Sequence, residues 1–298
     1  MSSSKVITSK FDFLKADTIE SALDHLQKDN IKILAGGTDL INLIKADRVV
    51  PDGVLYIGNI SELKMLSVED GLTIGAGTVM GDVEKNSVIG KKYPALKEAV
   101  NSVGGWQIRN AATITGNICN ASPGADTVPS LVVHGAELVI TGKDNGVLSE
   151  RTMLLEDFLI GPGKIAIEKG EIVTAVKVPP VPDNSSSAFI RLARVTLDIA
   201  KINCAAWLQV ENNICLDIKI AIGSVAPTVV RALSVEKSLK GKEVTAESIK
   251  KAASEAVKDI SPISDIRATG DYRNKVAAVL VRDVLMNAVE RIRGEKLK

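Results

Sequence analysis

The chain has 298 residues and carries 37 basic and 36 acidic side chains, which gives a formal net charge of +1. Hydrophobic residues make up 45% of it, a share that excludes a disordered chain and, at this length, allows roughly two or three domains. The balanced charge and the small number of aromatics argue against nucleic acid as a partner. No leader-like or membrane-spanning apolar run occurs, so we predict a protein that binds no membrane and lies in the cytoplasm.

The first third of the chain is predicted to form short helices and strands joined by glycine turns. Asp17 or Thr18 is positioned to cap a helix, because Ala22, Leu23 and Leu26 follow on one face. The elements expected after this helix are a strand over 31–35, a turn over 36–39, a helix over 40–44, strands over 54–57 and 72–76, and a helix over 93–103 that ends at Gly104-Gly105.

The middle of the chain contains a weakly patterned stretch and the clearest linker. Residues 106–125 are rich in Gly, Asn, Thr and Ser, and such a stretch inside a compact domain is usually functional. Strands are expected over 137–141 and 171–178. Pro and Ser dominate residues 179–187, where proline favours extended backbone and the serines are not expected to pack into a core. We therefore predict the main domain boundary at this linker.

The last third of the chain is predicted to be α+β. Asn212-Asn213 is typical of a two-residue hairpin turn between two β-runs. The elements expected are strands over 201–210 and 214–222, helices over 229–239 and 245–259, and a final helix that begins near Tyr272 and carries an apolar stripe.

Two glycine-containing turns are the candidates for binding chemistry. Residues 35–40 read Ala-Gly-Gly-Thr-Asp-Leu between a predicted strand and a predicted helix, and residues 113–126 begin with Thr-Ile-Thr-Gly-Asn. Backbone N–H groups in such turns bind oxyanions, the arrangement that a dinucleotide pyrophosphate requires. The alternative is that the first turn is only a tight turn with a helix cap. Residues 75–81 do not fit GxGxxG and lack a good following helix, so their glycines are expected to mark bends.

Side chains suited to catalysis or metal binding are few. His25 lies in the polar part of the first predicted helix and His134 follows an apolar run, so structural roles are expected for both. Cys119, Cys204 and Cys215 show no CxxC spacing and are expected to be buried small hydrophobes. Neither a Ser-His-Asp triad nor a metal site is supported, and no catalytic residue is assigned. Any redox chemistry would therefore reside in a bound cofactor.

Four ordered motifs carry a family resemblance that spans nearly the whole chain. They are the 35–40 turn, the block from Gly104-Gly-Trp-Gln-Ile-Arg-Asn to Asp126, Gly-Pro-Gly-Lys at 161–164, and Asp-Ile-Arg-Ala-Thr-Gly-Asp-Tyr-Arg at 265–273. The chain resembles the FAD-binding medium subunit of the molybdenum hydroxylases, the xanthine dehydrogenase and carbon monoxide dehydrogenase group. The resemblance implies an α+β, vanillyl-alcohol-oxidase-type FAD-binding fold in two subdomains, 1–57 and 58–180, followed by a C-terminal flavoprotein domain, 181–298.

The resemblance also implies where FAD would bind. Residues 33–40 would wrap the pyrophosphate through backbone amides, with the Thr38 hydroxyl as a further donor, and Gly104 and the 113–117 turn would hold the other side. Asp126 would accept a hydrogen bond from the cofactor, Ile172 would pack on the flavin, and Arg191 lies near a position where relatives often have Lys. The implied cofactor-binding residues are Ile33, Leu34, Ala35, Gly36, Gly37, Thr38, Asp39, Leu40, Gly104, Thr113, Ile114, Thr115, Gly116, Asn117, Asp126, Ile172 and Arg191.

One position departs from the family pattern. Relatives commonly have the first glycine of a Gly-Gly-Asn turn where this chain has Thr115. A positive φ there would cost a threonine on the order of 1–2 kcal/mol, so we expect a β conformation instead. The scattered cysteines give no sign of the cysteine-rich insertion that marks the hydroxybenzoyl-CoA reductase branch of the family.

The function that the resemblance implies is electron transfer. A molybdopterin-binding large subunit would oxidise the substrate, a small subunit with [2Fe-2S] clusters would relay electrons, and FAD on this chain would pass them to NAD+ or another acceptor. Molybdopterin and the clusters are thus expected only in partner subunits. Two alternatives stay open: a stand-alone FAD-dependent NAD(P)H reductase of the same fold, and a non-redox scaffold subunit that has lost FAD. The intact turn glycines, Asn117 and Asp126 weigh against the scaffold.

Overall fold

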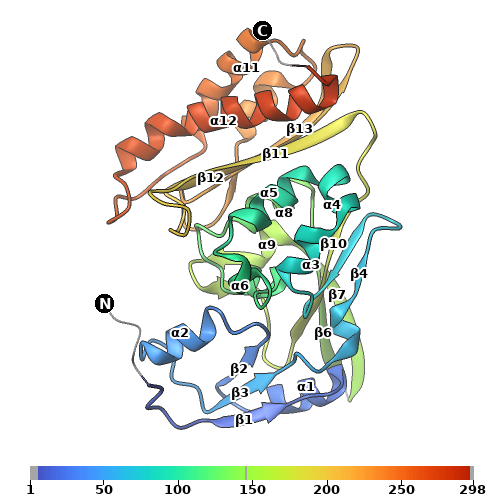
Figure 1. Cartoon of the computed structure of the whole chain (residues 1–298), viewed down its shortest axis with the longest axis vertical. Helices are drawn as coiled ribbons and strands as arrows, with labels where there is room; N and C mark the ends of the chain where they lie inside the picture. The colour runs from blue at the N-terminus through green and yellow to red at the C-terminus, as the bar shows by residue number, and fades with distance from the viewer. Residues whose placement is uncertain (1–5, 145, 296–298) are drawn as a thin grey trace.

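The computed structural model describes residues 6–144 and 146–295. Three main β-sheets follow one another along the chain, and they lie along the long axis of the molecule from the N-terminal sheet at the bottom of Figure 1 to the C-terminal sheet near the top. Helices lie between the second and third sheets and also cover the outer side of the third (Figure 1). A short two-stranded sheet, β8 (Leu159–Gly161) with β9 (Lys164–Ile165), accompanies the second.

The first sheet contains three parallel strands, with β3 (Gly53–Tyr56) between β1 (Asp12–Lys15) and β2 (Ile31–Leu34). Parallel neighbours need crossover connections, and here α1 (Ile19–Leu26) and α2 (Leu40–Lys45) lie in them. The turn that connects β2 to α2 is the first of the two candidate binding turns, so the sheet holds that turn at the carboxyl end of a strand.

The first helix begins and packs as its sequence predicts. Of the two candidate caps, Thr18 fills the role, because its side-chain oxygen accepts a hydrogen bond from the Ser21 backbone N–H at 3.1 Å. The apolar face of the helix is buried, which ties α1 to the first sheet through the core residues Ala22, Leu23 and Leu26.

The second sheet has five antiparallel strands in the order β4-β5-β10-β6-β7. Its central strand, β10, is the last of the five in the sequence, although it lies between β5 and β6 in the sheet. The strands are β4 (Leu66–Ser67), β5 (Leu72–Gly75), β6 (Glu137–Asp144), β7 (Val147–Leu154) and β10 (Ile172–Val178). The helices that accompany them are η1 (Ser61–Lys64), α3 (Met80–Lys85), α4 (Ser87–Lys92), α5 (Pro94–Ser102), α6 (Trp106–Arg109), α7 (Ile114–Cys119), α8 (Thr127–Val133) and α9 (Leu155–Phe158).

The third sheet is built around the predicted hairpin. Asn212 and Asn213 have φ values of +48° and +68°, the left-handed pair that a tight two-residue hairpin requires and that asparagine tolerates. The sheet contains β11 (Ser185–Leu192), β12 (Ile202–Glu211), β13 (Ile214–Gly223) and β14 (Val230–Arg231). Its helices are α10 (Leu233–Leu239), α11 (Ala246–Ala253), η2 (Ser254–Lys258) and α12 (Gly270–Arg293).

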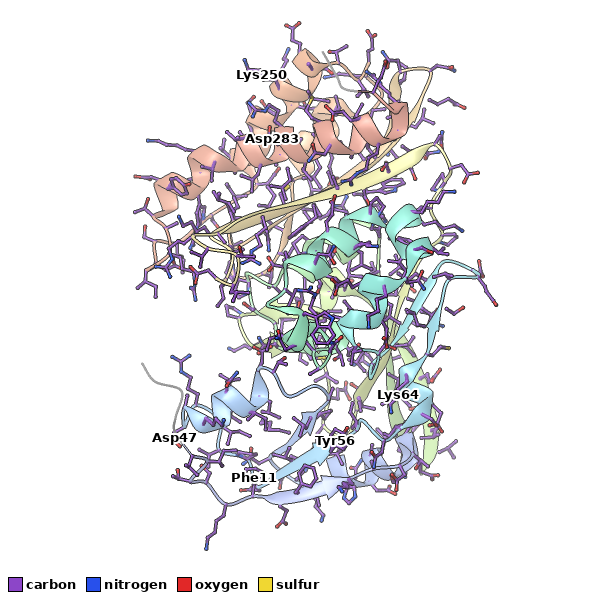
Figure 2. All side chains as sticks on the ribbon, in the orientation of Figure 1. Phe11, Asp47, Tyr56, Lys64, Lys250 and Asp283 are labelled. Carbon is purple, nitrogen blue, oxygen red and sulfur yellow. The ribbon has the colours of Figure 1, made fainter. Side chains whose placement is uncertain are left out.

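The third sheet separates two hydrophobic cores. Trp207 and Phe189 on one face belong to the core that α5, α8 and the second sheet share, whereas Cys204 and Leu208 on the other face pack with α10 to α12. Lys250 on α11 is exposed and lies on the side away from the sheet (Figure 2). The second and third sheets therefore share one apolar core, and the linker is not their only connection.

Several predictions for the second half of the chain were wrong in detail. The linker is shorter than 179–187, because Ser185 to Ser187 belong to β11 and Ser187 is fully buried. Its hydroxyl accepts a hydrogen bond from the Ala95 N–H and contacts His134, and this pairing is what lets a serine enter the core. The segment 229–239 begins as strand β14 before α10, and the helix expected over 245–259 changes to 3-10 geometry at Ser254.

Among the helices of residues 6–144 and 146–295, none combines the length and the apolar character that crossing a lipid bilayer requires.

Candidate functional site

The first candidate turn presents a run of unpaired backbone donors. Gly37 has φ of +71°, so the chain reverses there in a conformation that favours glycine. Within the described part of the chain, the N–H groups of residues 36–40 donate to no protein acceptor, and the Asp39 side chain does not cap α2. These residues are half-buried or exposed, so a ligand can reach them. Five consecutive amides without acceptors form the kind of concave donor array that holds an oxyanion.

A close backbone approach joins this turn to the second one. A Cβ built on Gly36 would lie 1.9 Å from the Ala111 carbonyl oxygen and 3.0 Å from the Ala112 Cα. Only glycine fits this contact, because the obstacle is backbone and not a flexible side chain. Gly36 and residues 111–112, which are far apart in the sequence, therefore lie against each other. The first turn is more than a tight turn with a helix cap.

The second turn is the start of helix α7. Thr113 caps it, since its side-chain oxygen accepts a hydrogen bond from the Gly116 N–H at 2.9 Å. Asn117 accepts a hydrogen bond from the Thr127 hydroxyl at 2.7 Å, which ties α7 to α8. Ile114 is fully buried, so it can offer a ligand only its backbone. The weakly patterned stretch, residues 106–125, thus contains two short helices, α6 and α7, and leads into α8.

The β conformation expected at Thr115 is wrong. Thr115 lies in the first turn of α7 and has no positive φ, so the backbone accepts threonine without strain because a helix start does not need glycine. The residue is 6% exposed, and its hydroxyl oxygen has no hydrogen-bond partner in the described structure. A buried hydroxyl without a partner is uncommon in a protein interior, and it fits a neighbourhood that a polar ligand would complete.

Gly104 marks the point where α5 ends and the second motif begins. Its φ is +51°, and a Cβ there would meet the Ile108 side chain at 3.0 Å. Arg109 holds this corner: its guanidinium bonds both carboxylate oxygens of Glu84, at 2.7 and 2.9 Å, and donates to the Val103 and Gly104 carbonyls at 3.3 Å. The Arg109 pair lowers the pKa of Glu84, so this carboxylate stays charged. The arginine of the second motif is therefore a structural anchor.

Asp126 lies in a buried polar cluster at the start of α8. One carboxylate oxygen accepts a hydrogen bond from the Asn203 side-chain amide at 2.8 Å, and the other forms an ion pair with Arg191 at 3.2 Å. Burial raises the pKa of Asp126, while Asn203 and Arg191 oppose that shift. Each carboxylate oxygen has two lone pairs and so can accept a further hydrogen bond from a ligand.

Ile172 lies in the core between the first and second sheets. Its side chain is 2% exposed and belongs to the core that links the first sheet to the second, with Leu55, Ile57 and Leu63. Its side chain offers little surface in this arrangement, and a contact between Ile172 and the flavin stays a prediction. Ile33, Leu34 and Ala35 are half-buried, and Ile33 and Ala35 pack against this same core at the edge of the first turn.

The third glycine-rich segment, residues 75–81, is structural. A Cβ on Gly75 would lie 2.3 Å from the Leu63 carbonyl oxygen, so this glycine permits a close backbone crossing. The Met80 N–H donates to the Ala112 carbonyl at 2.8 Å, which supports the second turn from behind. The expectation that no helix follows was wrong, because α3 begins at Met80. With only six residues, this helix is too short to show a helical period in the sequence.

The histidines and cysteines take structural positions. His134 is buried, contacts the Ser187 hydroxyl at 3.0 Å and meets the Tyr93 ring edge-on; burial lowers the pKa of His134 to about 3, so it is neutral. His25 lies half-exposed in the last turn of α1. Cys204 and Cys215 are buried as predicted, Cys119 is half-buried, and all three are free. Within the described ranges, no group of three or more His, Cys, Asp or Glu is arranged to hold a metal ion.

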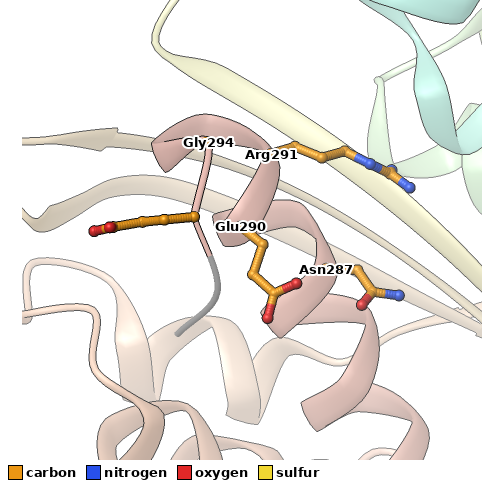
Figure 3. Close-up of a pocket in the computed structure, with 5 residues that line it drawn as sticks. Asn287, Glu290, Arg291 and Gly294 are labelled. Atoms are coloured by element: carbon orange, nitrogen blue, oxygen red, sulfur yellow. The ribbon is translucent and has the colours of Figure 1, made fainter. Parts of the chain in front are cut away.

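A shallow hollow at the far end of the molecule does not belong to this site. It lies at the C-terminal end of α12 and is lined by Asn287, Glu290, Arg291, Gly294 and Glu295 (Figure 3). Arg291 is already engaged, because its guanidinium bonds the Glu98 carboxylate and the Ser187 carbonyl. The hollow has mixed charge and no unpaired buried group, so we assign no ligand to it.

The site as a whole fits an extended dinucleotide. The 36–40 amides supply donors for a pyrophosphate, the Gly36–Ala111 contact closes the two turns together, and the Thr115 hydroxyl leaves a polar position unfilled. Thr38 is half-exposed beside the free amides and its hydroxyl has no protein partner among the described residues. The chemistry of these donors suits an anion and offers no side chain for acid–base work.

Comparison with known proteins gives the class. Residues 9–181 match the family described as the FAD binding domain in molybdopterin dehydrogenase, and residues 187–288 match the CO dehydrogenase flavoprotein C-terminal domain. The chain therefore belongs to the family of FAD-binding medium subunits of the molybdenum hydroxylases. The family, the fold class and the oxidoreductase assignment predicted from the sequence are confirmed.

Relatives match over most of their length. The chain is 33% identical to the glyceraldehyde dehydrogenase medium chain of Sulfolobus acidocaldarius, over 91% of this chain and 95% of that one. It is 32% identical to the xanthine dehydrogenase FAD-binding subunit of Escherichia coli O157:H7, over 96% of this chain and 99% of that subunit. A solved carbon monoxide dehydrogenase from Hydrogenophaga pseudoflava superposes with a TM-score of 0.90 at 29% identity, covering 96% of this chain and 99% of that one.

Proposed function

We propose that this chain is the FAD-carrying electron-transfer subunit of a molybdopterin-dependent hydroxylase or dehydrogenase. In this function it takes electrons from [2Fe-2S] clusters of a small subunit and passes them through FAD to NAD+ or another acceptor. The observation that carries the proposal is the run of free amides at residues 36–40, closed against residues 111–112 by Gly36. A pyrophosphate is the ligand whose charge and length suit such a donor run.

The residues proposed to hold FAD belong to three segments. Amides of residues 36–40 and the Thr38 hydroxyl would bind the pyrophosphate, and residues 113–117 with Gly104 would contact the cofactor from the other turn. Asp126 would accept one hydrogen bond through a lone pair that Asn203 and Arg191 leave free. When bound, FAD supplies the capacity to accept and donate electrons singly or in pairs, which no side chain here offers.

The protein's own contribution is binding, orientation and shielding. Thr113 and Gly36 fix the relative position of the two turns, and the core beneath them excludes water from their inner side. Arg191 and Asn203 offset part of the cost of burying the Asp126 carboxylate, whose pKa is raised by burial. No proton transfer by a side chain is needed in the proposed function.

The names of two relatives support a multi-subunit assembly. They are called medium chains, of a glyceraldehyde dehydrogenase and of a carbon monoxide dehydrogenase. We propose a molybdopterin-binding large subunit and a [2Fe-2S] small subunit as the partners of this chain. The substrate would then be chosen in the large subunit. A cytoplasmic location and the domain limits at residues 57 and 180 stay predictions.

Purification of the chain with its partner subunits tests the proposal. We expect a yellow complex with one FAD per chain, with flavin reduced by substrate and reoxidised by NAD+ or a soluble dye. A colourless native complex without flavin would favour the scaffold. A chain that migrates alone in native extracts and oxidises NADPH with a small substrate would favour the stand-alone reductase. Either result would contradict the proposed function.

A further inference from the structure

Arg191 contacts several protein segments beside the proposed site. One guanidinium nitrogen, Nη1, donates to the Ser102 carbonyl and pairs with Asp126 at 3.2 Å. The other, Nη2, donates to the carbonyls of Thr196, at 3.1 Å, and Asp198. The side chain is 9% exposed.

These contacts join three segments that meet at the site. Ser102 is the last residue of α5, two positions before Gly104, and Asp126 begins α8. Thr196 and Asp198 belong to the β11–β12 loop, residues 193–201. A planar guanidinium can donate in several fixed directions at once, whereas an ammonium acts as a point charge. A single arginine can therefore orient both the carboxylate and the loop.

The loop needs such a support. It exposes three aliphatic side chains, with Val195 at 63%, Leu197 at 69% and Ile199 at 51% exposure, so burial of its own side chains holds it only weakly. Ile199 lies on the second motif, because a Cβ on Gly124 would be 3.1 Å from its Cγ2 atom. The position of the loop thus affects the segment that leads into Asp126.

The guanidinium has little capacity left for a ligand. An arginine has five N–H donors, and the contacts above engage both terminal nitrogens with four protein oxygens. The remaining donor, Nε, is buried and has no partner in the described structure, so solvent does not reach it. A cofactor could bond Nη1 or Nη2 only if one of the existing contacts broke, and Nε is open only to a group that reaches into the interior.

We propose that Arg191 is a positioning residue for the FAD site, which holds the Asp126 carboxylate and the 193–201 loop in place and does not itself bind the cofactor. This inference rests on the proposed function. It changes the expectation for Arg191 from that of a direct FAD ligand to that of a clamp between three protein segments.

The test uses Arg191→Met and Arg191→Lys in the full chain, with Arg194→Met as the matched control. Arg194 lies in the same loop but is 58% exposed, and among the described residues it pairs only with Asp198, at 2.8 Å. Amide hydrogen exchange of residues 193–201 is measured on the flavin-free proteins, and FAD affinity is measured by fluorescence titration. Circular dichroism verifies that each variant is folded.

We expect Arg191→Met to speed loop exchange without FAD and to weaken FAD binding, each by roughly tenfold, the loss typical of a buried charge-assisted hydrogen bond. Arg191→Lys should restore part of the FAD affinity through its pair with Asp126 but leave the loop in faster exchange. Arg194→Met should leave both values near wild type. If Arg191→Met does not fold, Arg191→Lys decides the matter, and unchanged loop exchange in it overturns the proposal.

The pH profile separates positioning from general destabilisation. The groups that face Asp126 are Arg191 from β11, Asn203 from β12 and Ser102 at the end of α5. Removal of the Arg191 charge should raise the pKa of Asp126 further. As the pH is lowered, FAD binding by Arg191→Met should therefore begin to weaken at a higher pH than FAD binding by the wild type. A variant with the wild-type pH profile would contradict the clamp.

Two results would overturn the assignment of Arg191. Loss of FAD affinity with unchanged loop exchange in the flavin-free protein would make it a direct ligand. Unchanged affinity and unchanged exchange would remove it from the site. A wild-type chain that binds no FAD would instead overturn the proposed function, so the two failures are distinguishable.

Discussion

Two glycine-rich turns, residues 36–40 and 75–81, look alike in sequence but differ in what their backbones do. In residues 75–81, the N–H groups of Gly75, Ala76, Gly77 and Thr78 all donate to carbonyls of the protein at 2.7–3.0 Å. In residues 36–40, all five consecutive N–H groups have no acceptor among the described residues. Both turns contain a glycine against which another backbone segment packs closely, Ala111 in one case and Leu63 in the other.

The difference shows that glycine content does not identify a binding turn. Gly36 and Gly75 each permit a close backbone crossing, so each has a packing reason to be glycine. What separates the turns is whether the amides next to the glycine are already satisfied. Unpaired amides at an accessible turn are free to donate to an anionic ligand, and this property, not the glycine, supports the proposal that FAD binds here.

The largest effect expected is at the two crossing glycines. Gly36→Ala places a Cβ 1.9 Å from the Ala111 carbonyl oxygen, so the two turns must separate. We expect the purified protein to contain almost no flavin, together with a stability loss of about 1–3 kcal/mol from overpacking. Absorbance of the purified chain and a denaturant titration measure the two effects.

Gly75→Ala is the matched control for this substitution. Its Cβ would lie 2.3 Å from the Leu63 carbonyl oxygen, so the stability loss should be similar, while the folded fraction keeps its FAD affinity because the amides there bind only protein. Full flavin occupancy in Gly36→Ala, or equal flavin loss in both variants, would remove the distinction between the turns.

The two kinds of polar group should also respond differently to pH. The free amides at 36–40 do not titrate, whereas the buried His134 has a pKa lowered to about 3 by burial. The unfolded chain therefore binds a proton at His134 below about pH 6.5 that the folded chain rejects, so stability is full above that pH and falls as the pH drops. The slope is up to about 1.4 kcal/mol per pH unit.

His134→Asn should remove this part of the slope. Denaturant midpoints between about pH 7 and 5, on either side of the ordinary histidine pKa, measure the difference between wild type and variant. Parallel curves would show that His134 is not held neutral in the core.

A smaller effect is expected at two threonines, one in each turn. The Thr38 hydroxyl has no protein partner within the described ranges, whereas the Thr78 hydroxyl donates to the Met65 carbonyl at 2.9 Å. Thr38→Val should weaken FAD binding by about 1 kcal/mol, roughly fivefold, with little change in stability. Thr78→Val should show the reverse, a stability loss of about 1 kcal/mol with unchanged FAD affinity. If Thr38→Val binds FAD as tightly as wild type, the hydroxyl is not a donor to the cofactor.

The sequence was a good guide where local rules decide the structure. The strand–turn–helix over residues 31–45 and the Asn212-Asn213 hairpin follow from periodicity and turn chemistry, and both are confirmed. The glycine motifs also led to the family, because their order along the chain is specific.

Tertiary contacts decided what the sequence could not predict. Ser187 is buried because Ala95 and His134, far away in the sequence, satisfy its hydroxyl. Thr115 is helical because the chain after Thr113 begins α7, a helix too short to show periodicity. The Gly36–Ala111 approach and the Arg191 contacts likewise join segments that no local pattern connects.

Amide hydrogen exchange with and without FAD tests the central claim most directly. The wild-type chain is compared in both states, with the rates at residues 36–40 and 75–80 resolved separately. We expect FAD to slow exchange strongly at residues 36–40, where it would supply the missing acceptors, and to leave residues 75–80 unchanged. Equal rates at residues 36–40 in the two states, with FAD bound, would contradict the assignment of this turn as the pyrophosphate site.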